Sequence, residues 1–378
     1  MGRRLIIAGG GIGGMAAALA LEREGIAVNV FERAPAFAEI GAGMSLWPNA
    51  TRILRSWGVL DPLLETSETV THFDLLRPDG GTISTIPMGG FDTPAVCLHR
   101  ADLHRVLMRA LSPGCVVPDR RLVSFTHGAD IGVTADFAGG PSVRADGLIG
   151  ADGVHSVVRA RLHGPSDPIF RGYCIWRGIG PETPGGSRGH ITETWGRGQR
   201  FGVMPMGGGR VCWYATRNGP AAQADGDKGR KSEIQGLFAG WHRPIQELIE
   251  GTNASDIIKN DAQDRRALPR WSRGCVTLLG DAAHPITPNV GQGACMAIED
   301  AACLAKSLRG EPDLAAGFAA YEEARRGRTT FVGRQSRRIG AIGQLENPIV
   351  VAARNLVTRA VLFASRDMTL NSVYGFES

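Results

Sequence analysis

The chain has few lysines and no C-x-x-C motif, and each absence argues against a class of protein. Only four of its 42 basic residues are lysines, and no block of five or six like charges occurs, so the net charge of +5 does not indicate nucleic-acid binding. The seven cysteines are odd in number and are never spaced as C-x-x-C, which argues against a disulfide framework or a zinc site. We expect no metal site, and a reducing cytoplasm suits such thiols.

Long apolar runs and an N-terminal leader are also absent. The most apolar late stretch, residues 349–364, contains Arg354 and Arg359 and is too short and too charged to span a bilayer. The N-terminus runs almost directly into residues 5–8 and then into glycines, without the apolar region of a signal peptide. We therefore expect a soluble, cytoplasmic protein with no membrane span. Its 378 residues predict two or three domains.

Glycine, by contrast, is abundant, with 52 residues, about twice the usual share. Residues 5–8 indicate a buried strand, the segment GGGIGG a turn, and the residues up to position 24 a helix rich in alanine and leucine. A second strand is predicted over 27–31. This βαβ unit carries G-x-G-x-x-G between a strand and a helix, with an acid about twenty residues further on, which is the context of a dinucleotide-binding fingerprint.

The residues of this turn have distinct expected roles. Gly9 allows the tight turn, Gly11 lets a pyrophosphate approach the backbone, and Gly14 lets the helix pack closely on the strand. The helix N-terminus presents free N–H groups to the phosphates. Glu32 is placed to accept hydrogen bonds from an adenosine ribose.

Two later motifs follow predicted strands in the same way. GADGVHSVVR follows a strand over residues 146–150, and GDAAHPITPNVGQG follows an apolar strand over residues 275–279. The second strand delivers Asp281 to its C-terminal end, and a glycine loop then opens a helix that runs to about residue 308. Distant parts of the chain are therefore expected to form one site. Between the first two motifs, the segment 40–54 with GAGMSLWPN is expected to be a loop that leads into a short helix.

The middle of the chain has a different texture, with short alternating segments rich in aromatic residues over residues 170–216. This pattern predicts an antiparallel sheet inserted as a second domain. Alternation places Tyr173, Ile175 and Arg177 on one face and Trp176 on the other. The chain beyond residue 314 is predicted to be helical. Its basic run, formed by Arg325, Arg326 and Arg328, is expected to lie on a solvated helix face.

Taken in order, the three motifs resemble those of the single-component FAD-dependent aromatic hydroxylases, the para-hydroxybenzoate hydroxylase-like flavoprotein monooxygenases. The segments SLWPN, VCLHRADLHRVL and TPNVGQGACMAIEDA are most similar to the branch with bacterial urate hydroxylase, salicylate hydroxylase and zeaxanthin epoxidase. The resemblance implies an α/β fold: a Rossmann-like FAD-binding domain, an inserted antiparallel-sheet substrate domain and C-terminal helices. The expected boundaries are 1–165 with 262–340 for the FAD-binding domain, 166–261 for the substrate domain and 341–378 for the helical segment.

The resemblance also implies roles for individual residues. Non-covalent FAD is expected to contact Gly9, Gly11, Gly13, Gly14, Glu32, Arg33, Ser45, Arg100, Asp281, Gly291, Gln292, Gly293 and Ala294. Asp152 either contacts a ligand or has a structural role. Trp47, Arg177, Arg200 and Tyr214 are expected at the substrate, although the pocket tyrosine of urate hydroxylase falls at Cys212. His284 either takes a phenolic proton or holds its turn by hydrogen bonds.

The implied reaction is hydroxylation of a small, anionic aromatic or heteroaromatic substrate with O2, through a C4a-hydroperoxyflavin. No second G-x-G-x-x-G follows a strand, so NAD(P)H is expected to bind transiently. The missing redox cysteine pair disfavours disulfide reductases, and the missing W-x-W-x-I-P disfavours flavin halogenases. Two alternatives stay open: epoxidation or hydroxylation of a larger isoprenoid, quinolone or polyketide-like substrate, and a non-catalytic flavin-binding redox sensor. Either a monomer or a homodimer is compatible with the sequence.

Overall fold

A parallel sheet forms the first layer of the computed structural model, which describes residues 3–37, 43–128, 132–182 and 188–375 but not the side chains of 362–372. Its strands lie in the order β18-β12-β1-β2-β8. They are β1 (Arg4–Ala8), β2 (Ala27–Phe31), β8 (Val116–Val117), β12 (Gly147–Gly150) and β18 (Val276–Leu278). The apolar run at residues 5–8 is buried in β1, because this strand lies between β12 and β2.

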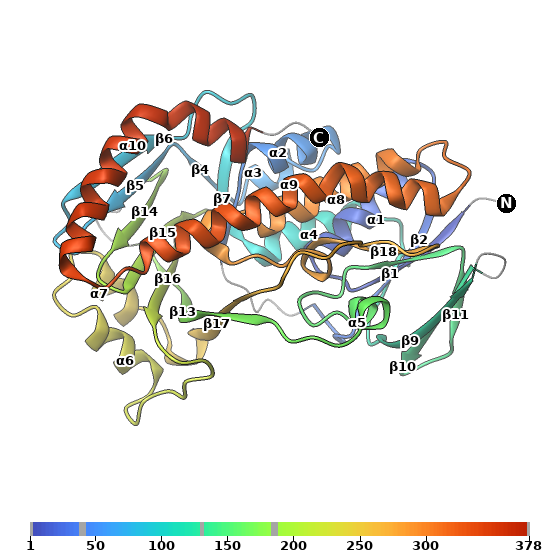
Figure 1. Ribbon diagram of the computed structural model, residues 1–378, viewed down its shortest axis with the longest axis horizontal. Helices are drawn as coiled ribbons and strands as arrows, with labels where there is room; N and C mark the ends of the chain where they lie inside the picture. The colour runs from blue at the N-terminus through green and yellow to red at the C-terminus, as the bar shows by residue number, and fades with distance from the viewer. Residues whose placement is uncertain (1–2, 38–42, 129–131, 183–187, 376–378) are drawn as a thin grey trace.

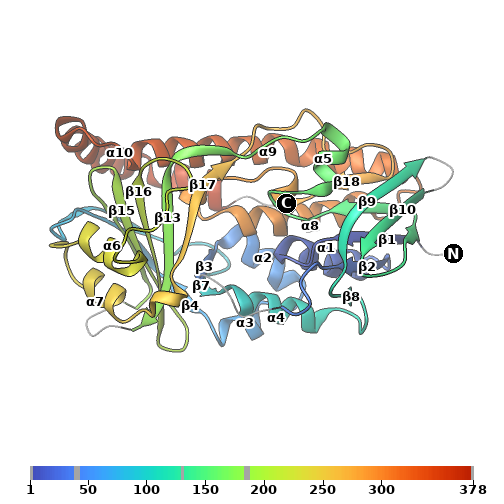
Figure 2. The same cartoon turned by 90° about the horizontal axis from the view of Figure 1, so that it is seen from below.

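Helices cover this sheet and join it to the rest of the chain. They are α1 (Ile12–Arg23), α2 (Pro48–Ser56), α3 (Asp61–Leu64), α4 (Arg100–Ala110), α5 (Val157–His163) and α8 (Gly293–Leu308). α1 packs against α8, and both views show the two helices side by side near the strands of the parallel sheet (Figures 1 and 2). The helix expected to run to about residue 308 is confirmed as α8.

A second, larger sheet has the order β17-β13-β16-β15-β14-β5-β6. Its strands are β5 (His72–Leu76), β6 (Thr82–Pro87), β13 (Ile169–Pro181), β14 (His190–Trp195), β15 (Gln199–Met206), β16 (Arg210–Asn218) and β17 (Ile258–Asp264). Neighbouring strands are antiparallel except β14 and β5, which are parallel. Helices α6 (Arg230–Leu237) and α7 (Ile245–Glu250) cover one face, over a core that includes Trp176, Trp213 and Phe201.

Two parts of this arrangement differ from the sequence expectations. Strands β5 and β6 join the larger sheet although they lie outside the predicted range 166–261, and those domain boundaries stay a prediction. Residues 43–46, expected within a loop, form β3 (Gly43–Leu46), which pairs with β7 (Ala95–His99) beside β4 (Glu68–Val70). Unpaired strand edges are unfavourable, and both additions give an edge a partner. A further small sheet contains β9 (Arg121–Gly128), β10 (Gly132–Ala138) and β11 (Val143–Ala145).

The chain ends in two long helices, α9 (Leu314–Gly343) and α10 (Pro348–Tyr374), as expected for a helical C-terminus. α9 runs from the parallel sheet to the antiparallel sheet, and α10 then turns back over β5 and β6 (Figure 1). The buried Arg354 anchors α10 because it donates to the carbonyls of Gly343 and Gly196 and lies over the Trp195 ring. Among the described residues, no helix combines the length and the apolarity needed to cross a bilayer.

Replacing Gly14 by alanine should destabilise the protein, because the new Cβ would lie 1.9 Å from the carbonyl oxygen of Gly9. Overpacking of this kind typically costs about 1–3 kcal/mol of unfolding free energy. In the control, Gly327→Ala in α9, the new Cβ meets no neighbouring atom within 4 Å, and we expect a gain of about 0.5–1 kcal/mol. Urea unfolding followed by circular dichroism measures both. A Gly14→Ala protein as stable as the wild type would contradict this contact.

Candidate active site

The three glycine-containing motifs meet at one edge of the parallel sheet. In the strand register, Ala8 of β1 lies beside Gly150 of β12, which lies beside Leu278 of β18. Each motif begins where its strand ends, so the turns at residues 9–14, 151–156 and 279–284 are neighbours. The carboxyl edge of an open α/β sheet is where such folds bind ligands.

The glycines of the first turn are required by close backbone packing. Gly9 has a φ of +104°, and a Cβ there would lie 2.4 Å from the Ala151 carbonyl oxygen. A Cβ at Gly13 would lie 2.9 Å from a methyl carbon of Leu279, and a Cβ at Gly14 would lie much closer to its neighbour, 1.9 Å from the Gly9 carbonyl oxygen. Gly9 and Gly13 therefore bring the turn close to the other two motifs, and Gly14 brings α1 close to its own strand.

Gly11 differs from the other glycines of the turn. The nearest atom to a Cβ there would be Arg100 Nη2, at 4.0 Å. Gly11 is also the N-cap of α1 and supplies no side-chain cap to the first N–H groups of this helix. Free amides, a helix dipole and a nearby guanidinium together form a site for an anion such as a pyrophosphate.

Asp281 lies across from this turn, at the end of β18. Its side chain is exposed, yet the surrounding protein raises the pKa of the carboxyl group, while the nearby His284 and Arg100 oppose that rise. Arg100 thus adjoins both the first and the third motif, as the sequence predicted for residues of one site.

Glu32 holds the first turn from the end of β2. Its carboxylate accepts hydrogen bonds from the backbone N–H groups of Gly10 at 2.7 Å and Ala34 at 2.9 Å. His104 of α4 adds a bond of 2.7 Å between its Nε2 and the Gly10 carbonyl, and burial lowers the pKa of its imidazole. Sequence reasoning missed His104, whose only signal is a histidine in an amphipathic helix. Arg33 is exposed beside the turn.

Asp152 caps α5. Its Oδ2 accepts from the backbone N–H groups of Val157 at 2.7 Å and Val158 at 3.2 Å, and burial raises the pKa of the carboxyl group. In the same motif, the buried Arg159 donates to the carbonyls of residues 282 and 283. The middle motif therefore supports the third motif through Arg159. The hydrogen bonds of Asp152 support a structural role for this residue, and its contact with a ligand stays a prediction.

The third motif meets β3 and α2 at Gly291, whose φ of +60° is left-handed. The indole Nε1 of Trp47 donates to the Gly291 carbonyl at 3.1 Å, and a Cβ at Gly291 would lie 2.8 Å from Ser45 Oγ. The Trp47 ring contacts Tyr374 at the end of α10, with 4.4 Å between ring centroids. The C-terminal helix therefore returns to the site, which no sequence pattern indicated.

The start of α8 is open like that of α1. Gln292 is its N-cap but gives no side-chain cap, because its buried amide pairs with the Asn49 amide at 2.9 Å. A Cβ at Gly293 would meet no atom within 4 Å. The free N–H groups near Gly293 and Ala294 and the positive end of the helix dipole suit a developing negative charge.

His284 is bound to the protein. Its Nε2 lies 2.5 Å from Asp300 Oδ2, and its ring contacts Trp271 with 5.1 Å between centroids. Although burial opposes it, the charges of His284 and Arg325 lower the pKa of Asp300 to about 2. These contacts support the turn-holding role of His284, and the base role stays a prediction.

The basic run on α9 is not a solvated face, contrary to expectation. Arg325 and Arg328 are 1% and 9% exposed and face Glu299 and Asp300 of α8. Of the three arginines, only Arg326 is exposed, with 44% of its side-chain surface accessible. The two acids in the segment CMAIEDA were the missed signal, because a buried carboxylate needs a cation from a neighbouring element.

On the larger sheet, alternation is confirmed. The register pairs Arg177 with Tyr214, and Tyr214 with Gly202, two residues from Arg200, so these side chains share one face. Trp176 lies on the opposite face, in the core with α6 and α7. The face with the arginines points to the first layer, because Tyr173 OH donates to Asn289 Oδ1 at 3.1 Å.

Arg177 is half-buried beside Tyr173, Tyr214 and Cys212. Burial lowers the pKa of its guanidinium, an effect opposed by those three neighbours. Within the described residues, it makes neither a hydrogen bond nor an ion pair. Arg177 is therefore a cation to which the described residues supply no counter-charge.

Arg200, by contrast, is fully engaged. It is 2% exposed and donates to Glu193 at 3.1 Å, Asn289 at 2.7 Å and Gln344 at 2.9 Å. Glu193 thus supplies the counter-charge of Arg200. Burial and the same Glu193 raise the pKa of Tyr214 well above its usual value.

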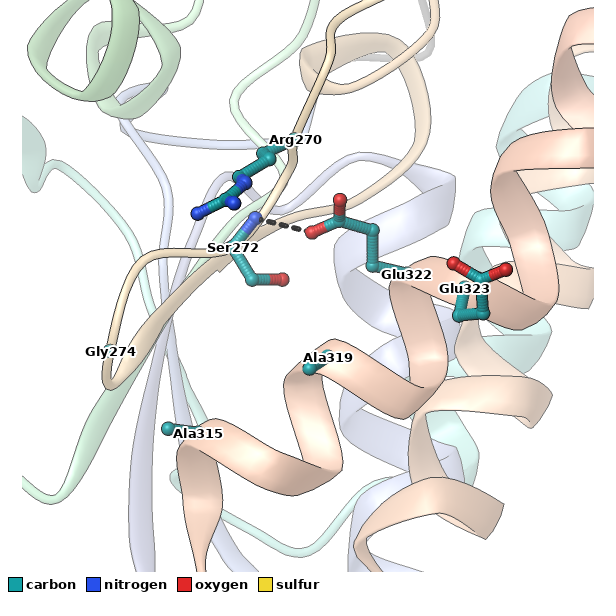
Figure 3. Close-up of a pocket in the computed structure, with 7 residues that line it drawn as sticks. All are labelled: Arg270, Ser272, Gly274, Ala315, Ala319, Glu322 and Glu323. Carbon is teal, nitrogen blue, oxygen red and sulfur yellow. Dashed lines mark hydrogen bonds between the residues drawn. The ribbon is translucent and has the colours of Figure 1, made fainter.

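A shallow surface pocket of about 280 Å³ lies apart from this site. Figure 3 shows its lining: Arg270, Ser272, Gly274, Ala315, Ala319, Glu322 and Glu323, from the loop before β18 and from α9. None of the predicted cofactor or substrate residues lines it, so we do not assign it to the site.

Comparison with known proteins agrees with this geometry. A family model described as FAD binding domain matches residues 4–335. An aurachin C monooxygenase/isomerase from Stigmatella aurantiaca is 40% identical over 362 residues, which cover 95% of this chain and 94% of that protein. A 6-hydroxynicotinate 3-monooxygenase from Bordetella bronchiseptica is 35% identical over 361 residues, which cover 91% and 93%.

A solved structure extends the agreement to the fold. Klebsiella pneumoniae HpxO, complexed with FAD and uric acid, has a TM-score of 0.88 and 28% identity, and covers 95% of this chain and 93% of that chain. The predicted α/β fold and the resemblance to flavoprotein hydroxylases are confirmed. The chain therefore belongs to the FAD binding domain family, as an FAD-dependent monooxygenase of the aromatic hydroxylase group.

Proposed function

We propose that this monooxygenase hydroxylates a small, planar aromatic or heteroaromatic compound that carries a negative charge. The observation that carries the proposal is Arg177, a half-buried cation on the site-facing side of the sheet whose partner the described protein residues do not supply. Such a charge is unfavourable until an anion compensates it, and a carboxylate or an ionised ring would do so. The relative named for 6-hydroxynicotinate and the HpxO complex with uric acid support this class.

The residues at the sheet edge fit FAD. The amides at Gly11 and the start of α1 bind the pyrophosphate, Glu32 accepts from the ribose, and Asp281 accepts from the ribitol hydroxyls. The amides at the start of α8 stabilise negative charge at the pyrimidine edge. Bound FAD supplies the oxidation chemistry once NAD(P)H has reduced it and O2 has reacted.

The larger sheet holds the substrate. Arg177 binds the anionic group, and the rings of Tyr173 and Tyr214 pack against the planar ring. Arg200 keeps the site-facing surface rigid, because its three protein partners fix it. Trp47 forms the wall next to the third motif, and His284 holds the turn that carries Asp281.

A larger substrate is the second candidate. The aurachin C monooxygenase/isomerase and a zeaxanthin epoxidase from Solanum lycopersicum, 33% identical over 85% of this chain and 52% of that protein, favour it. Cys212, at the position where urate hydroxylase is expected to have a tyrosine, leaves more room near Arg177. Aromatic acids and purines that stimulate NAD(P)H oxidation by the holoprotein would favour the first candidate, and neutral polyprenyl compounds the second.

We infer the cytoplasm as the compartment. All seven cysteines are free thiols, which suits a reducing environment. The choice between monomer and homodimer stays a prediction.

Asp281→Ala should weaken FAD binding by about tenfold to a hundredfold, because a hydrogen bond that involves a charged group contributes about 1.5–3 kcal/mol. The wild-type protein should be yellow and should release FAD on heat precipitation. Fluorescence titration of the apoprotein measures the affinity, and Asp227→Ala, in an exposed loop, is the control. Unchanged affinity in a folded Asp281→Ala protein would remove this residue from the cofactor site.

Arg177→Gln should raise the KM for the anionic substrate by about tenfold to a hundredfold and leave FAD content unchanged, because one charge-assisted hydrogen bond is lost. The matched control is Arg217→Gln. Arg217 lies on β16 and pairs with Glu233 of α6, on the other face of the sheet. Steady-state NAD(P)H oxidation measures KM. If Arg177→Gln kept the wild-type KM, the anion-anchor role would fail and the larger neutral substrate would become the leading candidate.

A further inference from the structure

A buried ionic cluster lies behind the cofactor site, formed by Glu299 and Asp300 of α8 and Arg325 of α9. Both acids are completely buried, and Arg325 is 1% exposed. Arg325 Nε lies 2.7 Å from Asp300 Oδ1, and Arg325 Nη2 lies 2.6 Å from Glu299 Oε2. One guanidinium therefore holds two adjacent carboxylates in fixed positions.

Within this ionic cluster, Asp300 holds the turn that contains Asp281. Asp300 Oδ2 accepts from the backbone N–H of Gly280 at 3.1 Å and lies 2.5 Å from His284 Nε2. These two contacts lie on either side of Asp281, so the orientation of the Asp281 carboxylate depends on Asp300.

Glu299 is connected through Asn49 to the start of α8. Asn49 Nδ2 donates to Glu299 Oε1 at 2.5 Å and to Gln292 Oε1 at 2.9 Å. Asn49 lies two residues after Trp47, and Gln292 immediately precedes Gly293, so both ends of this path border the cofactor surface. Asn49 and Gln292 are each at most 1% exposed, which makes an unsatisfied amide there unfavourable.

We propose that Arg325 is a positioning residue for the flavin, which sets the turn at Asp281 and the open N-terminus of α8 as one unit. Arg325 does not touch the cofactor itself and acts through Asp300 on one side and through Glu299 and Asn49 on the other. The proposal depends on FAD binding and not on the proposed substrate.

The contacts from Arg325 through Glu299 to the start of α8 predict an effect on the midpoint potential of the bound flavin. The N–H groups at the start of α8 stabilise a reduced, anionic flavin more than an oxidised, neutral one. If Arg325 orients these groups, its loss weakens binding of reduced FAD more than that of oxidised FAD. The midpoint potential of the bound flavin then becomes more negative, whereas general loosening of the fold would weaken both redox states equally.

The test uses two substitutions that leave the buried charges balanced. Arg325→Lys keeps the positive charge but cannot bridge both carboxylates with a planar fork. Asn49→Ala cuts only the path from Glu299 to Gln292 and serves if Arg325→Lys fails to fold. The matched control is Arg326→Lys, the next residue of α9, whose side chain is 44% exposed. For each holoprotein we would measure FAD affinity by titration, the flavin midpoint potential by dye-linked reduction, and thermal unfolding.

We expect Arg325→Lys to bind oxidised FAD roughly tenfold more weakly, the equivalent of one charge-assisted hydrogen bond, and to have a more negative flavin potential. Asn49→Ala should shift the potential in the same direction, and Arg326→Lys should change neither quantity. Wild-type potentials in both Arg325→Lys and Asn49→Ala would overturn the proposal, even if their affinity and thermal stability fell together, because that pattern indicates a purely structural role. These measurements need no substrate, so they are independent of the Arg177 hypothesis.

Discussion

The site depends on backbone contacts so close that only glycine permits them. At Gly14 the first helix touches its own strand, at Gly9 the first turn touches the middle motif, and at Gly13 α1 lies against the third motif. A Cβ at Gly9 or Gly14 would lie 2.4 Å or 1.9 Å from a backbone carbonyl oxygen, so the backbone there would have to move apart. Because the three contacts share one edge of the parallel sheet, they decide where the ends of β1, β12 and β18 lie, and so where amides and carboxylates can converge on FAD. Gly11 is the exception, because the nearest atom to a Cβ there would be Arg100 Nη2 at 4.0 Å, so close packing does not require this glycine.

The second constraint is that each buried charged side chain needs an opposite charge beside it. Glu299 and Asp300 are compensated by Arg325 and Arg328, and Arg200 is compensated by Glu193. Such networks fix geometry more than they add stability, since the desolvation penalty offsets much of the attraction. Their placement between α8, α9 and the sheets suits that role, because these are the elements that carry the cofactor loops. Arg328 extends the network further by donating to the Val373 carbonyl, which attaches the end of α10 near Trp47.

The elements that sequence predicted well are those whose signal is local. A strand, a glycine turn and a helix can be read from neighbouring residues, and so can the alternation that separates Arg177 from Trp176. The pairing of β14 with β5 cannot, because its partners are more than a hundred residues apart and neither strand specifies the other. The same holds for Arg325, whose burial depends on two acids of another helix, and for Tyr374, which reaches Trp47 only because α10 turns back over the molecule. In each case the missing information was tertiary, and at Arg325 residue type alone favoured a solvated position.

Arg177 and Arg200 lie on the same face of the larger sheet but differ in their tertiary contacts, and this difference changes the role that each can have. By sequence, Arg177 and Arg200 are equivalent, because each is a cation on an apolar, aromatic-rich surface. In the structure, three protein groups surround Arg200, whereas Arg177 has tyrosine rings beside it and no protein partner among the described residues. Removal of Arg200 would leave Glu193 as a buried, uncompensated charge, so a defect there would report on the protein as much as on the substrate. Of these two arginines, Arg200 has a counter-charge among the described residues and Arg177 has none, which is why the proposal of an anionic substrate rests on Arg177 rather than on Arg200.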